Sequence, residues 1–89
     1  RWLERRIAEV EKMRVIKPAT EAEVGGHPAV VMVYEEDAVS GIYSVRGYAA
    51  FVCAHNWLYL LEVAGMAEYD PLVRRTYETF VEGFRSPAQ

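Results

Sequence analysis

The sequence has little of what several classes of protein require. Its single cysteine excludes an internal disulfide, and a zinc site would need both histidines and nearby carboxylates to converge on that residue. It has no excess of positive charge. The net charge of −3 and the pI near 5.3 argue against a dedicated nucleic-acid-binding protein. With 52% apolar and 26% charged residues, it also lacks the composition of a disordered or low-complexity chain.

No stretch of the sequence makes a good membrane-spanning segment. Residues 47–66 have a suitable length, but His55, Asn56 and Glu62 near the middle would raise the cost of insertion. Two apolar strands joined by a turn explain these residues better. We therefore expect no transmembrane segment in this chain.

The length of 89 residues permits one small domain, which we assign to residues 1–89. Because the chain starts at Arg1 and not at Met, we expect an upstream segment, without which the domain would be incomplete. A signal peptide there would make the protein secreted or a lipoprotein. The residues themselves leave the compartment unknown.

The apolar pattern predicts an α+β domain: a helix, a four-stranded antiparallel meander and a second helix. Two turn signals divide the meander. They are Gly25-Gly26 and His55-Asn56, where positive φ is tolerated. The predicted elements are a helix over 2–13, an edge strand over 14–24, strands over 28–36, 42–54 and 57–64, and a helix capped by Tyr69 or Asp70 with Pro71 at its first position.

Both faces of the predicted sheet are apolar. A two-residue turn at His55-Asn56 places Ala54 opposite Trp57 and continues in register to Tyr48 opposite Val63. Small residues at 47, 49 and 64 would let a helix approach one face closely. Two helices cannot cover both faces of four strands, and the last strand forms an apolar edge. We therefore expect an α/β/α sandwich that is completed by a missing segment or by a second subunit.

Several short runs carry a resemblance to a known superfamily. They are Gly26-His27-Pro28-Ala29, Tyr43 and Tyr48 in the long strand, the turn at His55-Asn56, Tyr59-Leu60-Leu61, and Phe84-Arg85-Ser86 after the last apolar stripe. Together they resemble the C-terminal part of the PsbP-like superfamily, which includes the Ran-binding Mog family and bacterial DcrB-like proteins. The resemblance implies an α/β/α sandwich around an antiparallel sheet. Known members are mostly not enzymes but assembly factors, lipoproteins, adaptors and chaperones for hydrophobic segments.

Few residues suggest catalytic or metal chemistry. Cys53 and His55 could share a metal on one side of a strand, but a core cysteine and a turn histidine explain them better. The acidic residues at 35–37 lack the ligand spacing of a calcium loop. No serine lies in a nucleophile-elbow context. We expect no catalytic residue, no metal and no cofactor.

The sequence therefore favours a non-catalytic protein-interaction or assembly domain that binds a protein partner or its own copy as a homo-oligomer. The candidate contact residues are Trp57, Tyr59, Tyr48, Leu61 and Arg46. Arg46 has a simpler role as the partner of an acid at the rim of the sheet. The alternatives are a chaperone for an apolar segment and a small-molecule or lipid carrier with a pocket lined by Phe51, Leu60 and Phe80.

Overall fold

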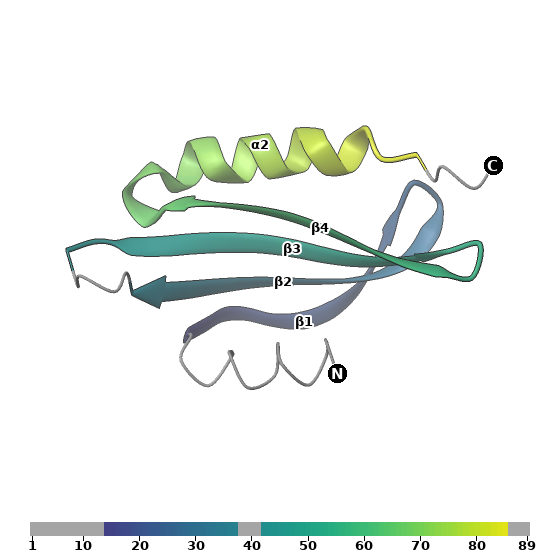
Figure 1. Cartoon of the computed structure of the whole chain (residues 1–89), viewed down its shortest axis with the longest axis horizontal. Helices are drawn as coiled ribbons and strands as arrows, with labels where there is room; N and C mark the ends of the chain where they lie inside the picture. The colour runs from purple at the N-terminus through teal and green to yellow at the C-terminus, as the bar shows by residue number, and fades with distance from the viewer. Residues whose placement is uncertain (1–13, 38–41, 86–89) are drawn as a thin grey trace.

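A computed structural model describes residues 14–37 and 42–85, which form a four-stranded antiparallel sheet followed by one helix (Figure 1). The strands, in sheet order, are β1 (Arg14–Val24), β2 (His27–Asp37), β3 (Ser44–Ala54) and β4 (Trp57–Met66). A 3-10 turn, η1 (Ala67–Tyr69), leads into helix α2 (Asp70–Glu82). This α+β arrangement confirms the predicted meander and closing helix. The helix predicted over 2–13 lies outside the described residues.

The two tight turns of the meander lie where the sequence predicts them. Gly25 and Gly26 have φ values of 59° and 81°, and His55 and Asn56 have 52° and 68°. Positive φ at both central residues is the requirement of a type I′ hairpin turn. The second turn fixes the pairing of β3 with β4, which runs from Ala54 opposite Trp57 to Val45 opposite Met66. The predicted register is therefore confirmed.

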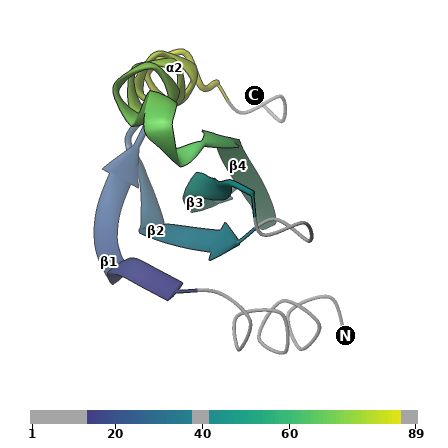
Figure 2. The same cartoon turned by 90° about the vertical axis from the view of Figure 1, so that its left-hand side faces the viewer.

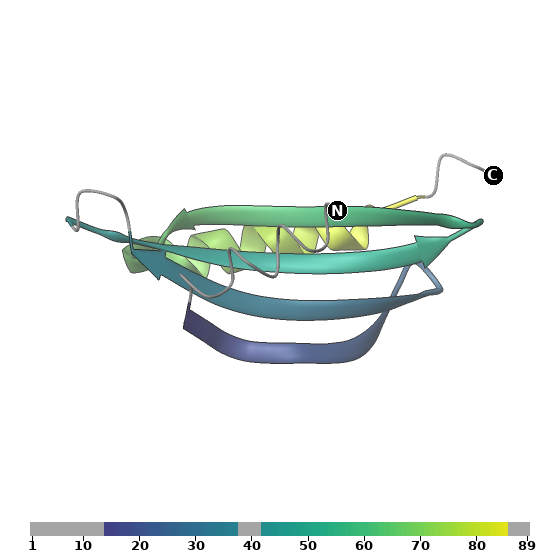
Figure 3. The same ribbon diagram turned by 60° about the horizontal axis from the view of Figure 1, so that its bottom comes forward.

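The two edge strands of the sheet differ in regularity (Figure 3). Strand β1 contains Pro18, and its pairing with β2 shifts register between Val15 and Lys17 and again between Lys17 and Thr20. Proline and bulges are typical of an edge that resists further pairing. Strand β4 pairs with β3 over its whole length without a shift.

Helix α2 covers one face of the sheet, and the sheet curves so that β1 and β4 lie on either side of it (Figure 2). The core beneath the helix is formed by Val24, Ala29, Ala50, Val52 and Leu61. Five partly buried side chains pack around this core: Val31, Tyr59, Tyr77, Val81 and Phe84. Gly65 lets the start of α2 approach β4, because a Cβ at this position would lie 2.7 Å from a methyl group of Val73.

On the opposite face, Tyr34 of β2 lies across β3. Its ring occupies the space that a side chain at Gly47 would need, and its hydroxyl donates a hydrogen bond to Glu62 on β4. Tyr34 is buried, with 6% of its surface exposed. The small residue at 47 therefore accommodates a tyrosine of the sheet, whereas α2 packs on the other face.

Candidate functional site

The outer edge of β4 is available to a partner strand in the part of the chain that the structure describes. Among residues 14–37 and 42–85, no strand lies beyond β4, and β4 contains no proline. A two-residue hairpin turn is flanked by a hydrogen-bonded pair, here Ala54 and Trp57, and hydrogen-bonded pairs then alternate along the ladder. The even-numbered residues of β4 therefore direct their N–H and C=O groups outward, away from β3. This edge offers a regular row of backbone donors and acceptors.

Large apolar side chains are exposed along the same strand. Trp57 is 64% exposed and Leu58 is 57% exposed, and the side chains of Leu60 and Met66 are exposed by 36% and 37%. The only acidic or basic residue of β4 is Glu62, which accepts the hydrogen bond from Tyr34. Charged side chains are the usual protection of an edge strand. Strand β4 thus has one charged side chain, which is engaged by Tyr34, and no irregularity to discourage pairing.

One flank of α2 extends this apolar surface. Val73, Tyr77 and Val81 face the sheet, while Arg74 and Glu78 lie toward β1 and β2. At 100° per residue, the opposite flank carries Leu72, Thr76 and Phe80. Leu72 is 61% exposed and Phe80 is 48% exposed, and their flank lies on the side of the molecule where β4 is the edge. We call the exposed apolar residues of both elements the β4–α2 edge: Trp57, Leu58, Leu60, Met66, Leu72 and Phe80.

Two of the five contact residues predicted from the sequence lie in the core. Tyr48 and Leu61 are each only 8% exposed, and Tyr48 stacks on Tyr77 with ring centroids 5.5 Å apart. Tyr59 is partly buried against Phe84, with ring centroids 5.5 Å apart. Tyr48 and Leu61 are therefore too buried to be direct partner contacts in this structure, and Tyr59 is partly covered. Trp57 alone of these aromatic residues remains exposed.

The residues predicted to line one pocket are on different faces. Phe51 and Leu60 face each other across β3 and β4 on the face opposite α2, whereas Phe80 is on α2 itself. Phe51 instead lines a hollow of about 370 Å³ together with Val30, Cys53 and Leu58. The predicted pocket of Phe51, Leu60 and Phe80 is therefore not formed.

A second hollow, of about 250 Å³, lies between α2 and strands β1 and β2. Its apolar floor includes Val31, Val33 and Tyr77, and its charged residues are Lys17, Arg74 and Glu78. We call this the β2–α2 hollow. It is an opening between helix and sheet that sequence reasoning did not find, because its lining residues come from four elements, β1, β2, β3 and α2.

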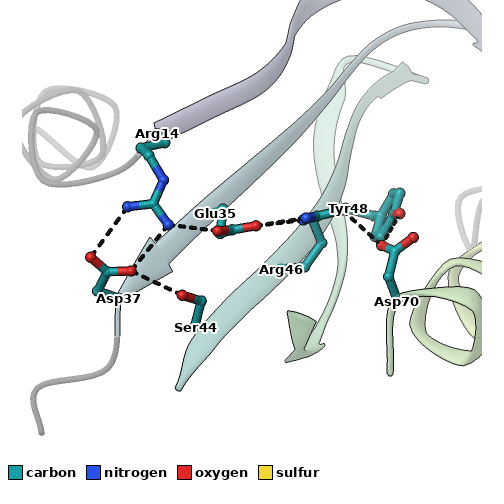
Figure 4. Close-up of polar contacts among 7 residues, drawn as sticks. All are labelled: Arg14, Glu35, Asp37, Ser44, Arg46, Tyr48 and Asp70. Atoms are coloured by element: carbon teal, nitrogen blue, oxygen red, sulfur yellow. Dashed lines mark hydrogen bonds and ion pairs between the residues drawn. The ribbon is translucent and has the colours of Figure 1, made fainter. Parts of the chain in front are cut away.

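Arg46 belongs to an ion-pair network at the end of the sheet where α2 begins (Figure 4). Its guanidinium donates to Glu35 at 2.6 Å and to Asp70 at 3.2 Å. Tyr48 also donates its hydroxyl proton to Asp70. Asp70 therefore joins the first turn of α2 to β3. Tyr69, the N-cap residue of the helix, makes no capping hydrogen bond with its side chain.

The network continues from Glu35 to β1. Arg14 donates to Glu35 at 2.5 Å and to Asp37 at 3.0 Å, and Ser44 donates to Asp37 at 2.9 Å. The Arg14 guanidinium, and then Arg46, holds the pKa of Glu35 below its ordinary value. Arg14 and then the Ser44 hydroxyl lower the pKa of Asp37 in the same way. Each of these charges has an opposite partner, which is the arrangement of a structural network and supports the simpler role for Arg46.

The pKa values of Tyr48 and Tyr77 lie above the ordinary value of tyrosine. Burial raises the pKa of both phenols, and hydrogen bonding to Asp70 raises that of Tyr48 further. The Tyr48 hydroxyl is therefore protonated at neutral pH and serves as a donor. It is not positioned as a base.

Acid should weaken this network before it affects the apolar core. Because the folded-state pKa of Glu35 is depressed, its contribution to stability is complete above its unfolded pKa of about 4.3 and is lost as the pH falls through the folded value. We expect the free energy of unfolding to fall on acidification below about pH 5, and Glu35→Gln to make that fall shallower. Urea unfolding at a series of pH values measures both. Glu36→Gln removes a carboxylate from the other face of β2 and is the matched control. If both variants changed the pH dependence of the free energy of unfolding equally, Glu35 would not be the residue responsible.

The described residues contain no grouping of three or more His, Cys, Asp or Glu side chains suited to a metal ion. Cys53 is exposed, and the rings of His27 and His55 contact each other edge to face with centroids 5.4 Å apart. In the part of the chain that the structure describes, no helix is both long and apolar enough to span a membrane.

Comparison with known proteins adds no relative: no protein family, no curated protein and no solved structure matches this chain.

Proposed function

We propose that this chain is a non-catalytic protein-interaction domain and that the β4–α2 edge is its contact surface. The observation that supports this most directly is the coincidence of two features on β4. Its outward backbone groups form an uninterrupted row, and its exposed side chains are large and apolar. An exposed, regular, apolar edge strand is a template for another strand.

The contrast with β1 strengthens the proposal. Strand β1 is interrupted by two register shifts, carries Pro18, and has charged side chains at Lys17, Glu21 and Glu23. Within residues 14–37 and 42–85, one edge of the sheet is therefore protected and the other is open. Such a difference is expected when one edge is used for binding.

The resemblance to the PsbP-like superfamily stays part of this proposal. An α/β/α sandwich needs a further layer beyond the two that the described residues form, α2 and the sheet. A contact at the β4–α2 edge would extend the sheet without adding that layer, and contact with a partner is in keeping with the assembly and adaptor roles that the resemblance implies.

A small-molecule or lipid carrier is the second candidate, and the β2–α2 hollow is the observation in its favour. The hollow combines an apolar floor with Lys17 and Arg74, which would suit a small anionic amphiphile. Its volume of about 250 Å³ is below the usual range of ligand pockets, about 300–1,000 Å³. A carrier would release such a ligand on denaturation, where mass spectrometry would detect it.

Site-specific photo-crosslinking tests the proposed function. A benzophenone amino acid at position 58 should form protein adducts in the cells that make this protein, because Leu58 lies on the β4–α2 edge. The same probe at position 16 is the control, since Ile16 is 49% exposed on the protected edge strand β1. Adducts at position 58 at a yield several times that at position 16 are expected. Equal yields, or no adduct at 58, would contradict the proposal.

A further inference from the structure

We infer that the partner of the β4–α2 edge is a second copy of this chain, with β4 pairing antiparallel to β4 of the copy about a two-fold axis at Val63. The inference rests on the proposed function and specifies its partner. It follows from the positions of β4 and α2 relative to each other, which make the edge complementary to itself.

The first step concerns the position of α2 along β4. Val73 lies against Gly65, and Tyr77 stacks on Tyr48, which is paired with Val63. Thr76, one residue before Tyr77, is therefore level with Val63. A two-fold axis through Val63 and normal to the sheet passes beside Thr76.

The second step concerns the flank of α2. Leu72 and Phe80 each lie four residues from Thr76, about 6 Å along the helix axis in opposite directions. A two-fold axis at this level places Leu72 of each copy next to Phe80 of the other. The same operation that pairs the strands therefore covers the two most exposed apolar residues of the helix. A lone partner strand would pair with β4 but leave this flank exposed.

The third step is the spacing of the helices. Helix α2 packs on both β3 and β4, with Tyr77 on Tyr48 of the first strand and Val73 against Gly65 of the second. With strands about 4.8 Å apart, a helix above the line between β3 and β4 is about 4.8 Å from the two-fold axis. The two copies of α2 are then about 10 Å apart, which is the usual packing distance of helices.

The fourth step is the register. Outward backbone groups belong to even-numbered residues, so these residues must pair with each other across the interface. An axis at Glu62 would oppose two carboxylates, and an axis at Leu61 would place Leu60 opposite Glu62. An axis at Val63 instead pairs Leu60 with Met66 of the copy and Glu62 with Ala64 of the copy. This register joins exposed apolar residues and separates the charges.

Mixed disulfide formation tests this register directly. Two variants are made in a Cys53→Ser background, one with Leu60→Cys and one with Met66→Cys. Directly paired strand residues have a Cα separation of about 5.5 Å, within the range of a disulfide. Mild oxidation of the mixture should yield a covalent heterodimer as the main product. Either variant alone should stay uncrosslinked, because its two cysteines, one from each copy, are separated by the distance from residue 60 to residue 66 along a strand, which is about 20 Å.

A second measurement separates the inference from the proposed function. Sedimentation of the full chain should show a dimer, and Leu60→Lys should weaken the dimer at least tenfold, while Ile16→Lys on β1 should leave it intact. A chain that stays monomeric, or a dimer that gives no heterodimer in the mixture, would overturn the inference. If the position-58 probe then captured a different protein, the proposed function would stand without self-association. If that probe captured nothing, both would fail.

Discussion

Replacing Gly47 with alanine is expected to destabilise the domain by about 3 kcal/mol, because Tyr34 occupies the space that the new methyl group would need. Tyr34 would have to leave its buried position across β3. Its hydrogen bond to Glu62 would be lost at the same time, and with it a tie between β2 and β4. Chemical denaturation followed by circular dichroism measures the change.

Gly83→Ala is the matched control for this prediction. Gly83 ends α2 with a φ of −86°, and a Cβ there would meet only backbone oxygens at ordinary contact distances of 3.6 and 3.8 Å. The control should be neutral or stabilising by less than about 1 kcal/mol. A Gly47→Ala protein within about 0.5 kcal/mol of the parent would show that Tyr34 does not lie across β3.

The strand order and the β3–β4 register follow from local sequence signals. Gly25-Gly26 and His55-Asn56 adopt the positive φ values that their residue types favour, and a two-residue turn fixes the register of the strands it joins. The strand ends differ by one or two residues. Strand β4 continues to Met66, and β3 begins at Ser44 and not at Ile42. These properties depend on residues close together in the chain.

The face that α2 covers could not be predicted, because both faces of the sheet are apolar. The small residues at 47 and 49 suggested a helix on their side, but Tyr34 fills the space above Gly47. On the other face, the Gly65–Val73 approach and the Tyr48–Tyr77 stack hold the helix. The sequence pattern favoured exposure of the wrong face. It therefore placed Tyr48 and Leu61 at a contact surface when they are in the core, and Tyr59 there when it packs against the core.

The ion-pair network was only partly visible in the sequence. Arg46 stood out as the single charge of a long strand, but its partners Glu35 and Asp70 are 11 and 24 residues away along the chain. The pairing of β2 with β3 places Glu35 directly opposite Arg46, so this pair could have been found once that register was known. The ion pair between Arg46 and Asp70 could not be predicted without the position of α2, which depends on tertiary packing.

Replacing Phe84 with alanine is expected to cost about 3 kcal/mol, because this residue anchors the C-terminal end of α2. Its ring packs edge to face on Tyr59, and it lies against the β1–β2 turn, where a Cβ at Gly25 would be 3.4 Å from the ring. Losing it would expose the end of the core around Val24, Ala29 and Val52, and the last turn of α2 would detach from the sheet.

Phe80→Ala is the control of the same residue type, measured at a protein concentration where the chain is monomeric. Phe80 is on the exposed flank of α2, so its replacement should change the free energy of unfolding by less than about 1 kcal/mol. Combining Phe84→Ala with Tyr59→Ala should give a coupling of about 1 kcal/mol, as expected for two rings in contact. Equal losses for Phe80→Ala and Phe84→Ala would mean that α2 is rotated about its axis. The Leu72–Phe80 flank would then not lie beside the free edge of β4, since the assignment of that flank depends on which side of the helix faces the sheet.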